Sequence, residues 1–195
     1  HFHTQFNKEI PWETMDMDFM NLNQSAHGDR EFGHIVTRMR KNRKVVVGHW
    51  QDEKAQAKIA VWMRVSAGWA DAQVMRIIRF RDQMNNVAGT DGDKVEAEMR
   101  LGYHVDYYPI ANLVALLNEV TDAEVAELVA TYEKEYVIAD EQKKNEHFNH
   151  QVKEAAKAEI ALRRFLVAKG AKAFTTNFDD LAGIDQLPGL ACQRL

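Results

Sequence analysis

Short runs rich in β-branched and aromatic residues alternate along this chain with longer segments of helical periodicity, and this alternation limits the possible folds more than any other feature. Each strand-like run is separated from the next by a helical pattern. Such an order is typical of βαβ units, in which parallel strands pair and helices cover the sheet. The sequence therefore predicts an α/β fold with mostly parallel sheets flanked by helices.

Five short runs predict strands because they are rich in β-branched or aromatic residues. In the first run, aromatic and threonine side chains alternate with histidine and glutamine, as they do in strands with one buried face. The five expected strands cover residues 1–6, 44–49, 74–80, 103–108 and 173–176.

Helical periodicity follows each of the first two strands. Asp29 is the expected N-cap of the first helix, and Gly68 is the expected end of the second. Apolar side chains recur at helical spacing along both helices, so we expect them to face a core. They are Phe32, Ile35, Val36 and Met39 in the first helix, and Ala55, Ile59, Trp62 and Met63 in the second.

Three later helices have clearer end signals. One begins near Lys94 after a loop rich in glycine and polar residues, and another begins at the capping box of residues 121–124. The last ends at Gly170, and the polar segment 139–151 before it is either an exposed connection or its frayed start. A domain boundary is expected at residues 70–74, between the second helix and the next strand.

Composition and charge exclude several classes of protein. With 46% hydrophobic and 28% charged residues, the chain is unlike a disordered protein. Its 25 basic and 29 acidic residues form no long block of one sign, which disfavours a nucleic-acid partner. No apolar run approaches the roughly 20 residues that span a bilayer, and the single cysteine cannot form an internal disulfide. We therefore expect no membrane partner and a cytoplasmic location.

Two small histidine clusters could contribute to a metal site. His1 and His3 lie on one face of the first expected strand, and Glu146, His147 and His150 fall within two turns of a helix. A metal ion needs three or four convergent ligands, which neither cluster supplies by itself. A solvated surface explains both clusters better than metal binding does.

Two polar loops could bind a ligand. Residues 90–93 could chelate a cation or a hydroxyl-rich molecule, but they lack the spacing of a calcium loop and fit a turn before a helix cap. Residues 21–31 crowd amides, a hydroxyl, an imidazole and charges together, and such a set can bind sugar hydroxyls or simply form a capped structural loop. No phosphate-binding or nucleophile-elbow motif occurs, which disfavours a nucleophilic hydrolase.

The second of these loops lies within a stretch that closely resembles a signature of bacterial L-arabinose isomerases, residues 16–33 (DMDFMNLNQSAHGDREFG). Further segments resemble the same family, in the same order and at compatible distances. They are residues 48–52 (GHWQD), 90–95 (TDGDKV), 173–178 (AFTTNF) and 186–191 (QLPGLA). The resemblance covers nearly the whole chain.

The resemblance implies a metal-assisted aldose–ketose isomerase that interconverts L-arabinose and L-ribulose, usually with manganese (Mn²⁺), and assembles as a hexamer of two trimers. Residues 1–75 would be the latter part of an N-terminal α/β domain and residues 76–195 most of a middle α/β domain, so the chain would hold parts of two doubly wound domains. The β-rich C-terminal domain would be absent. The glutamates and histidines that hold the metal are expected beyond Leu195, which leaves no metal ligand and no catalytic residue here and implies an inactive fragment.

The resemblance also implies a substrate-binding role for three residues. The family counterpart of His27 reaches into the active site of a neighbouring subunit, and the counterparts of Met84 and Phe178 form apolar walls of the sugar pocket. By residue type alone, all three fit local packing equally. Residues 81–85 read Arg-Asp-Gln-Met-Asn where the family commonly has Gly-Asp-Asn-Met-Arg, so the preference among related aldoses is open. The alternative function is a stand-alone α/β module for sugar binding or oligomerisation.

Overall fold

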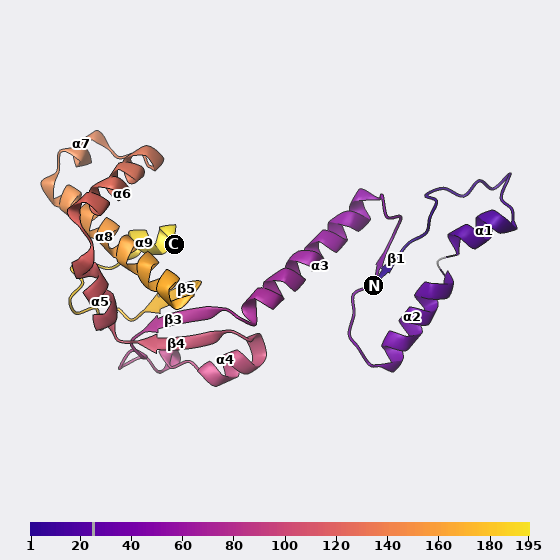
Figure 1. Cartoon of the computed structure of the whole chain (residues 1–195), viewed down its shortest axis with the longest axis horizontal. Coiled ribbons are helices and arrows are strands. Elements are labelled where there is room, and N and C mark those ends of the chain that lie inside the picture. Colours follow the sequence, from indigo (N-terminus) through magenta and orange to yellow (C-terminus); the bar gives the residue numbers. More distant parts are fainter. Residues whose placement is uncertain (25) are drawn as a thin grey trace. The chain divides into compact units, whose positions relative to one another are not determined.

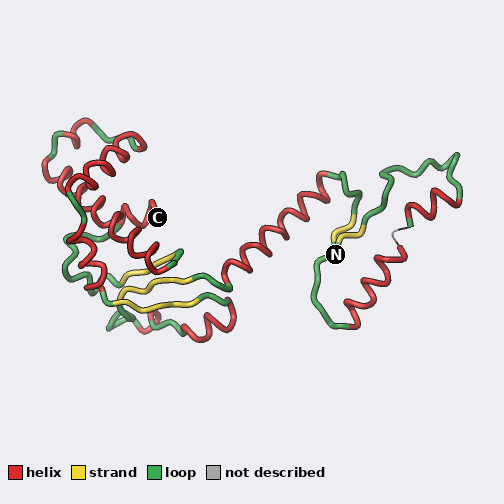
Figure 2. Tube along the Cα trace, in the orientation of Figure 1, coloured by secondary structure: helices red, strands yellow, loops and turns green. Residues whose placement is uncertain are grey.

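Every strand pair in the described part of the chain is parallel. The computed structural model describes residues 1–24 and 26–195, which divide into a first unit of residues 1–70 and a second unit of residues 71–195. The first unit holds a two-stranded sheet, and the second holds a three-stranded sheet of order β4-β3-β5 (Figure 1). Helices flank these strands (Figure 2), so the α/β prediction is confirmed.

The first unit consists mostly of helices around one short strand pair. Phe2 pairs with Val46 and His3 with Val47, and only these residues are in strand conformation where longer strands were expected. The elements of this unit, in chain order, are β1 (Phe2–His3), α1 (Met17–Asn23), α2 (Ala26–Arg38), β2 (Val46–Val47) and α3 (Glu53–Ala72), whose last residues belong to the second unit.

Two expected helix ends in this unit are wrong. Asp29 lies inside the first turn of α2, because that helix begins three residues earlier, at Ala26. The polar strip around it is therefore mostly helical rather than a loop, and Asp16 caps α1 by accepting a hydrogen bond from the Phe19 N–H at 2.8 Å. Gly68 does not end α3, since one interior glycine costs only about 1 kcal/mol relative to alanine and good helix formers flank it.

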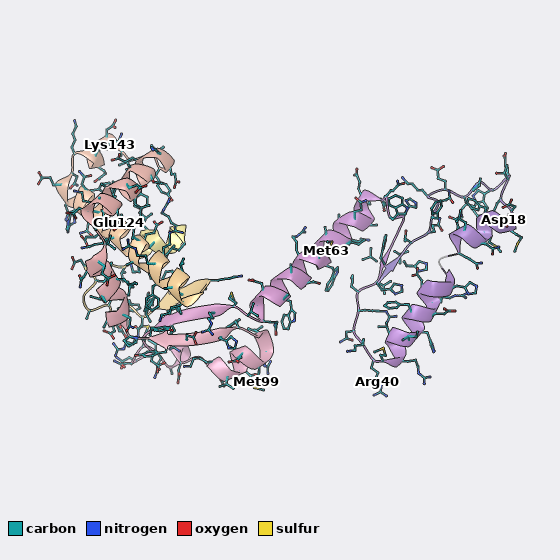
Figure 3. The ribbon with its side chains drawn as sticks, viewed as in Figure 1. Asp18, Arg40, Met63, Met99, Glu124 and Lys143 are labelled. Atoms are coloured by element: carbon teal, nitrogen blue, oxygen red, sulfur yellow. The ribbon has the colours of Figure 1, made fainter. Side chains whose placement is uncertain are left out.

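The apolar faces of α2 and α3 are largely exposed rather than buried, contrary to the sequence expectation. Phe32 and Ile35 on α2 are more than half exposed, and so is Met63 on α3 (Figure 3). Among the described side chains of the first unit, the buried apolar residues are Val46 and Ala55. Periodicity identified faces that avoid water, but nothing described in this unit covers them.

The second unit alternates strands and helices as the sequence predicts. Its strands lie within the expected runs, and α4 begins at Lys94 as expected, whereas α5, α7 and α9 were not predicted. The elements are β3 (Arg76–Phe80), α4 (Lys94–Leu101), β4 (His104–Tyr108), α5 (Ile110–Glu119), α6 (Asp122–Glu135), α7 (Asp140–Lys143), α8 (Glu146–Lys169), β5 (Ala173–Thr176) and α9 (Gly189–Arg194).

Helix ends in this unit follow local chemistry. The Thr121 N–H donates to the Glu124 carboxylate at 2.9 Å and the Glu124 N–H donates to the Thr121 hydroxyl at 3.4 Å, which confirms the capping box. The Thr121 hydrogen bond holds the pKa of the Glu124 carboxyl below its ordinary value. Gly170 ends α8 with φ of 61°, a conformation that favours glycine, as predicted.

The core lies on one face of the three-stranded sheet. Ile78 and Phe80, alternate residues of β3, are fully buried against α5 and α8. Phe165 of α8 packs against Phe80 and Tyr108, with ring centroids 5.1 Å apart in both pairs. This cluster is the main apolar core of the second unit.

A buried carboxylate joins α6, α8 and α9. Glu159 on α8 is only 1% exposed, and it accepts hydrogen bonds from the Tyr132 hydroxyl at 2.7 Å and from Arg194 Nε at 2.9 Å. Its other oxygen accepts from Arg163 at 2.9 Å. Burial and the neighbouring carboxylate raise the pKa of Tyr132, so the phenol stays a neutral donor.

Candidate substrate pocket

The strand order places a topological switch point in the second unit. The chain passes from β3 through α4 to β4 on one side, whereas β5 joins the opposite edge of β3 after α8. The connections therefore diverge between the carboxyl ends of β3 and β5. Ligands of open α/β sheets bind in the crevice at such a point.

A cavity of about 360 Å³ lies at this place, on the sheet face opposite to the core. Ile77 and Arg79 of β3 alternate with the buried Ile78 and Phe80, so they face the cavity side. The loop after β3, the start of α4 and the end of β5 complete the lining. Its walls combine apolar side chains with a few polar groups, as small-molecule sites do.

Asn177 joins the two strand ends at the switch point. Its side-chain amide donates to the main-chain carbonyls of Asp82 at 3.2 Å and Gln83 at 3.1 Å, and its oxygen accepts from the Asp179 N–H at 2.9 Å. Because Asn177 is only 8% exposed, these bonds face little competition from water. The loop that carries Met84 is thereby fixed to the end of β5.

Charged and hydroxyl side chains hold the rest of this loop. Arg79 pairs with the Asp82 carboxylate at 3.3 Å and donates to the main-chain oxygen of Thr90 at 3.2 Å. The Met84 N–H donates to the Thr90 hydroxyl at 3.0 Å. The segment 90–93 forms the expected helix cap, since the Asp93 carboxylate accepts from the N–H of Glu96 at 2.9 Å.

Two of the three predicted substrate-binding residues come together here. Met84 and Phe178 both line the cavity, although they lie far apart in the sequence, and Phe178 is 65% exposed. His27 is an exposed residue of α2 in the first unit. Asn177 and Thr90 belong to segments that the sequence had singled out, but their roles as supports could not be predicted without their distant partners.

The cavity does not contain a ligand set for manganese. Its carboxylates are Asp82 and Asp93, and no histidine lines it. Across the residues that the structure describes, the one cluster of three potential metal ligands is His1, His3 and Asp29 in the first unit. The expected cluster of Glu146, His147 and His150 does not bring three ligand atoms together. We therefore derive no chemical step through a metal here.

Replacing Asn177 by alanine should lower the free energy of unfolding by about 1–3 kcal/mol, because two buried carbonyls and one N–H lose their partner. Urea unfolding would measure the loss, and amide hydrogen exchange at residues 82–84 should accelerate. The exposed Asn112 on α5 is a matched control whose replacement by alanine should cost no stability. Equal stability of the wild type and the Asn177 variant would contradict this role.

In the described part of the chain, no helix is both long and apolar enough to cross a bilayer.

Comparison with known proteins places both units. Residues 1–74 match the L-arabinose isomerase N-terminal domain, and residues 76–195 match the L-arabinose isomerase central domain. The whole chain is 67% identical to an L-arabinose isomerase of Phocaeicola vulgatus, 65% identical to that of Bacteroides thetaiotaomicron and 54% identical to that of Herpetosiphon aurantiacus. The chain spans about 40% of the length of these relatives. It therefore belongs to the L-arabinose isomerase family, of which it represents the N-terminal and central domain regions.

Proposed function

We propose that this chain is part of an enzyme that converts L-arabinose to L-ribulose, and that the cavity between β3 and β5 forms part of its sugar pocket. The observation that carries the proposal is the meeting of Met84 and Phe178 in that cavity. The two residues come from separate family motifs and lie at the switch point where α/β sheets bind ligands. Family membership supplies the substrate class.

The cavity residues would position the sugar and exclude water. Met84 and Phe178 offer apolar walls, while Thr90 and Lys94 offer a hydroxyl and an ammonium group to sugar hydroxyls. Such fixed contacts accelerate a reaction by holding the substrate in a reactive geometry. Binding and orientation are therefore the work of this part of the enzyme.

Proton transfer between C1 and C2 needs further groups. The reaction requires a base and a positive charge that stabilises the developing enediolate, which bound manganese would supply in the complete enzyme. The cavity offers no ligand set for that ion. We therefore infer that the 195-residue chain alone is inactive.

Assembly and location complete the proposal. His27 is exposed on α2, as a residue that reaches into a neighbouring subunit must be. We propose that the complete enzyme is a homo-oligomer, a hexamer of two trimers, in which His27 contributes to a neighbour's pocket. A cytoplasmic location fits the single cysteine, Cys192, which has no partner for a disulfide within this chain.

The test uses the complete gene product and measures isomerisation of L-arabinose with added Mn²⁺. Replacing Met84 or Phe178 by alanine should lower kcat/KM at least about 10-fold, because apolar contacts with the substrate are lost. Met99 on α4 is a matched control, since it is 78% exposed and lies on the outer side of the helix (Figure 3). Met99→Ala should leave kcat/KM unchanged.

Three results would overturn parts of this proposal. Wild-type kcat/KM in both pocket variants would show that the cavity does not hold the sugar. Sustained turnover by the 195-residue chain alone would refute its inactivity. Binding of L-arabinose by a gene product that lacks isomerase activity would favour a sugar-binding module instead.

A further inference from the structure

Two histidines and an aspartate converge in the first unit from two different elements. His3 Nδ1 lies 2.7 Å from one carboxylate oxygen of Asp29, and His1 Nε2 lies 3.4 Å from the other. All three ligand atoms lie within 4.8 Å of one another. The carboxylate therefore faces two imidazole nitrogens at once, one with each of its oxygens.

We propose that His1, His3 and Asp29 form a binding site for a divalent transition-metal ion of the zinc class. Zinc binds imidazole nitrogen and carboxylate oxygen at about 2.0–2.2 Å, so neighbouring ligands of a tetrahedral ion lie roughly 3.3–3.6 Å apart. The 3.4 Å separation between His1 and Asp29 already has this value, and the other separations need only small side-chain rotations.

Burial at this site suits a three-ligand metal centre. The His1 side chain is 9% exposed and that of Asp29 is 23% exposed, whereas His3 is 38% exposed. One side of the cluster is therefore screened from water and the other is open. A metal ion held by three protein ligands would take a water molecule as its fourth ligand on the open side.

The main chain already holds the two histidines in place. The Val46 N–H donates to the carbonyl of His1 at 3.0 Å, and the Gly48 N–H donates to the carbonyl of His3 at 3.1 Å. The parallel pairing of β1 with β2 therefore fixes both residues, whose alternation directs the two imidazoles to the same side. Asp29 is fixed in the first turn of α2.

The ligand types select the metal. Two imidazoles and one carboxylate suit zinc and its transition-metal neighbours, while magnesium and calcium prefer sites made of oxygen atoms. Binding would tie β1 to α2 in a unit whose described buried apolar side chains are Val46 and Ala55. Because an ion that binds only the folded state stabilises it, zinc should raise the stability of this unit.

The test titrates Zn²⁺ into the chain, prepared without a histidine tag, by calorimetry at pH 7.5. One equivalent should bind, and Mg²⁺ should not. Asp29→Asn and His3→Gln should each weaken zinc binding by more than the 10–100-fold that loss of an outer-shell partner causes. His104→Gln is the matched control, because His104 also pairs with a carboxylate, that of Glu98 at 3.1 Å, but belongs to no three-ligand cluster in the described residues.

Two further measurements separate binding by the three side chains from binding by the terminal amine and from misfolding of a variant. A chain with one alanine added before His1 should bind zinc equally well, because the side chains rather than the terminal amine are the ligands. Co²⁺ should give the visible absorption of a tetrahedral site in the wild type and not in Asp29→Asn, with circular dichroism confirming that the variant is folded. Absence of saturable zinc binding, its survival in both ligand variants, or its loss in the extended chain would overturn the proposal. None of these readouts depends on isomerase activity.

Discussion

Replacing Glu159 by alanine should lower the free energy of unfolding by about 3–5 kcal/mol. The change leaves the Tyr132 hydroxyl buried without its acceptor and removes the carboxylate that pairs with Arg194. Such a loss is a large part of the stability of an ordinary domain. Urea unfolding followed by far-ultraviolet circular dichroism would measure it, because α6 and α8 contribute much of the helical signal.

Glu154→Ala is the matched control on the same helix. Its carboxylate lies 4.0 Å from Lys157, with about a third of the lysine side chain exposed, and pairs of this kind contribute about 0–1 kcal/mol. The two variants therefore differ only in the surroundings of the lost carboxylate. Similar unfolding midpoints for both would show that the Glu159 network does not stabilise the fold.

Replacing Phe165 by alanine should also cost about 3–5 kcal/mol, through a different cause. The ring lies between Phe80 of β3 and Tyr108 of β4, so its removal opens a cavity at the centre of the packing between helix and sheet. The unfolding midpoint in urea should fall while the slope of the transition stays unchanged, because the surface exposed on unfolding is nearly the same.

Phe178→Ala makes the same chemical change at a pocket wall. Because Phe178 is 65% exposed, its loss should change stability by less than about 1 kcal/mol, while we expect it to reduce sugar turnover. The pair separates folding from function within one type of substitution. A loss of stability in Phe178→Ala as large as that in Phe165→Ala would mean that the pocket wall is part of the core.

The features that could be predicted from the sequence depend on local chemistry. The capping box at Thr121, the start of α4 at Lys94 and the end of α8 at Gly170 are set by residues within one or two turns, and all three predictions are confirmed. The errors at Asp29 and Gly68 have the opposite cause. A residue that can cap or end a helix does so only when the neighbouring segment is not itself helical, and both neighbours are.

Long-range contacts account for what could not be predicted. The motifs around Met84 and Phe178 indicated a sugar pocket only through their resemblance to a family. Asn177 supports that pocket through partners 94 and 95 residues earlier, so no local pattern could assign this role. Likewise, His1 and His3 were visible as a pair, but their third partner, Asp29, became apparent only when β1 and α2 were placed side by side.

The alternation of residues along β3 makes errors in strand alignment costly. Ile78 and Phe80 face the core, while Ile77 and Arg79 face the cavity. If β3 slipped by one residue against β4 and β5, the guanidinium of Arg79 would enter the apolar core and the phenyl ring of Phe80 would fill the space intended for a ligand. A misaligned chain would thus be unstable as well as unable to bind, and quality control in the cell would remove such molecules before they could compete for partners.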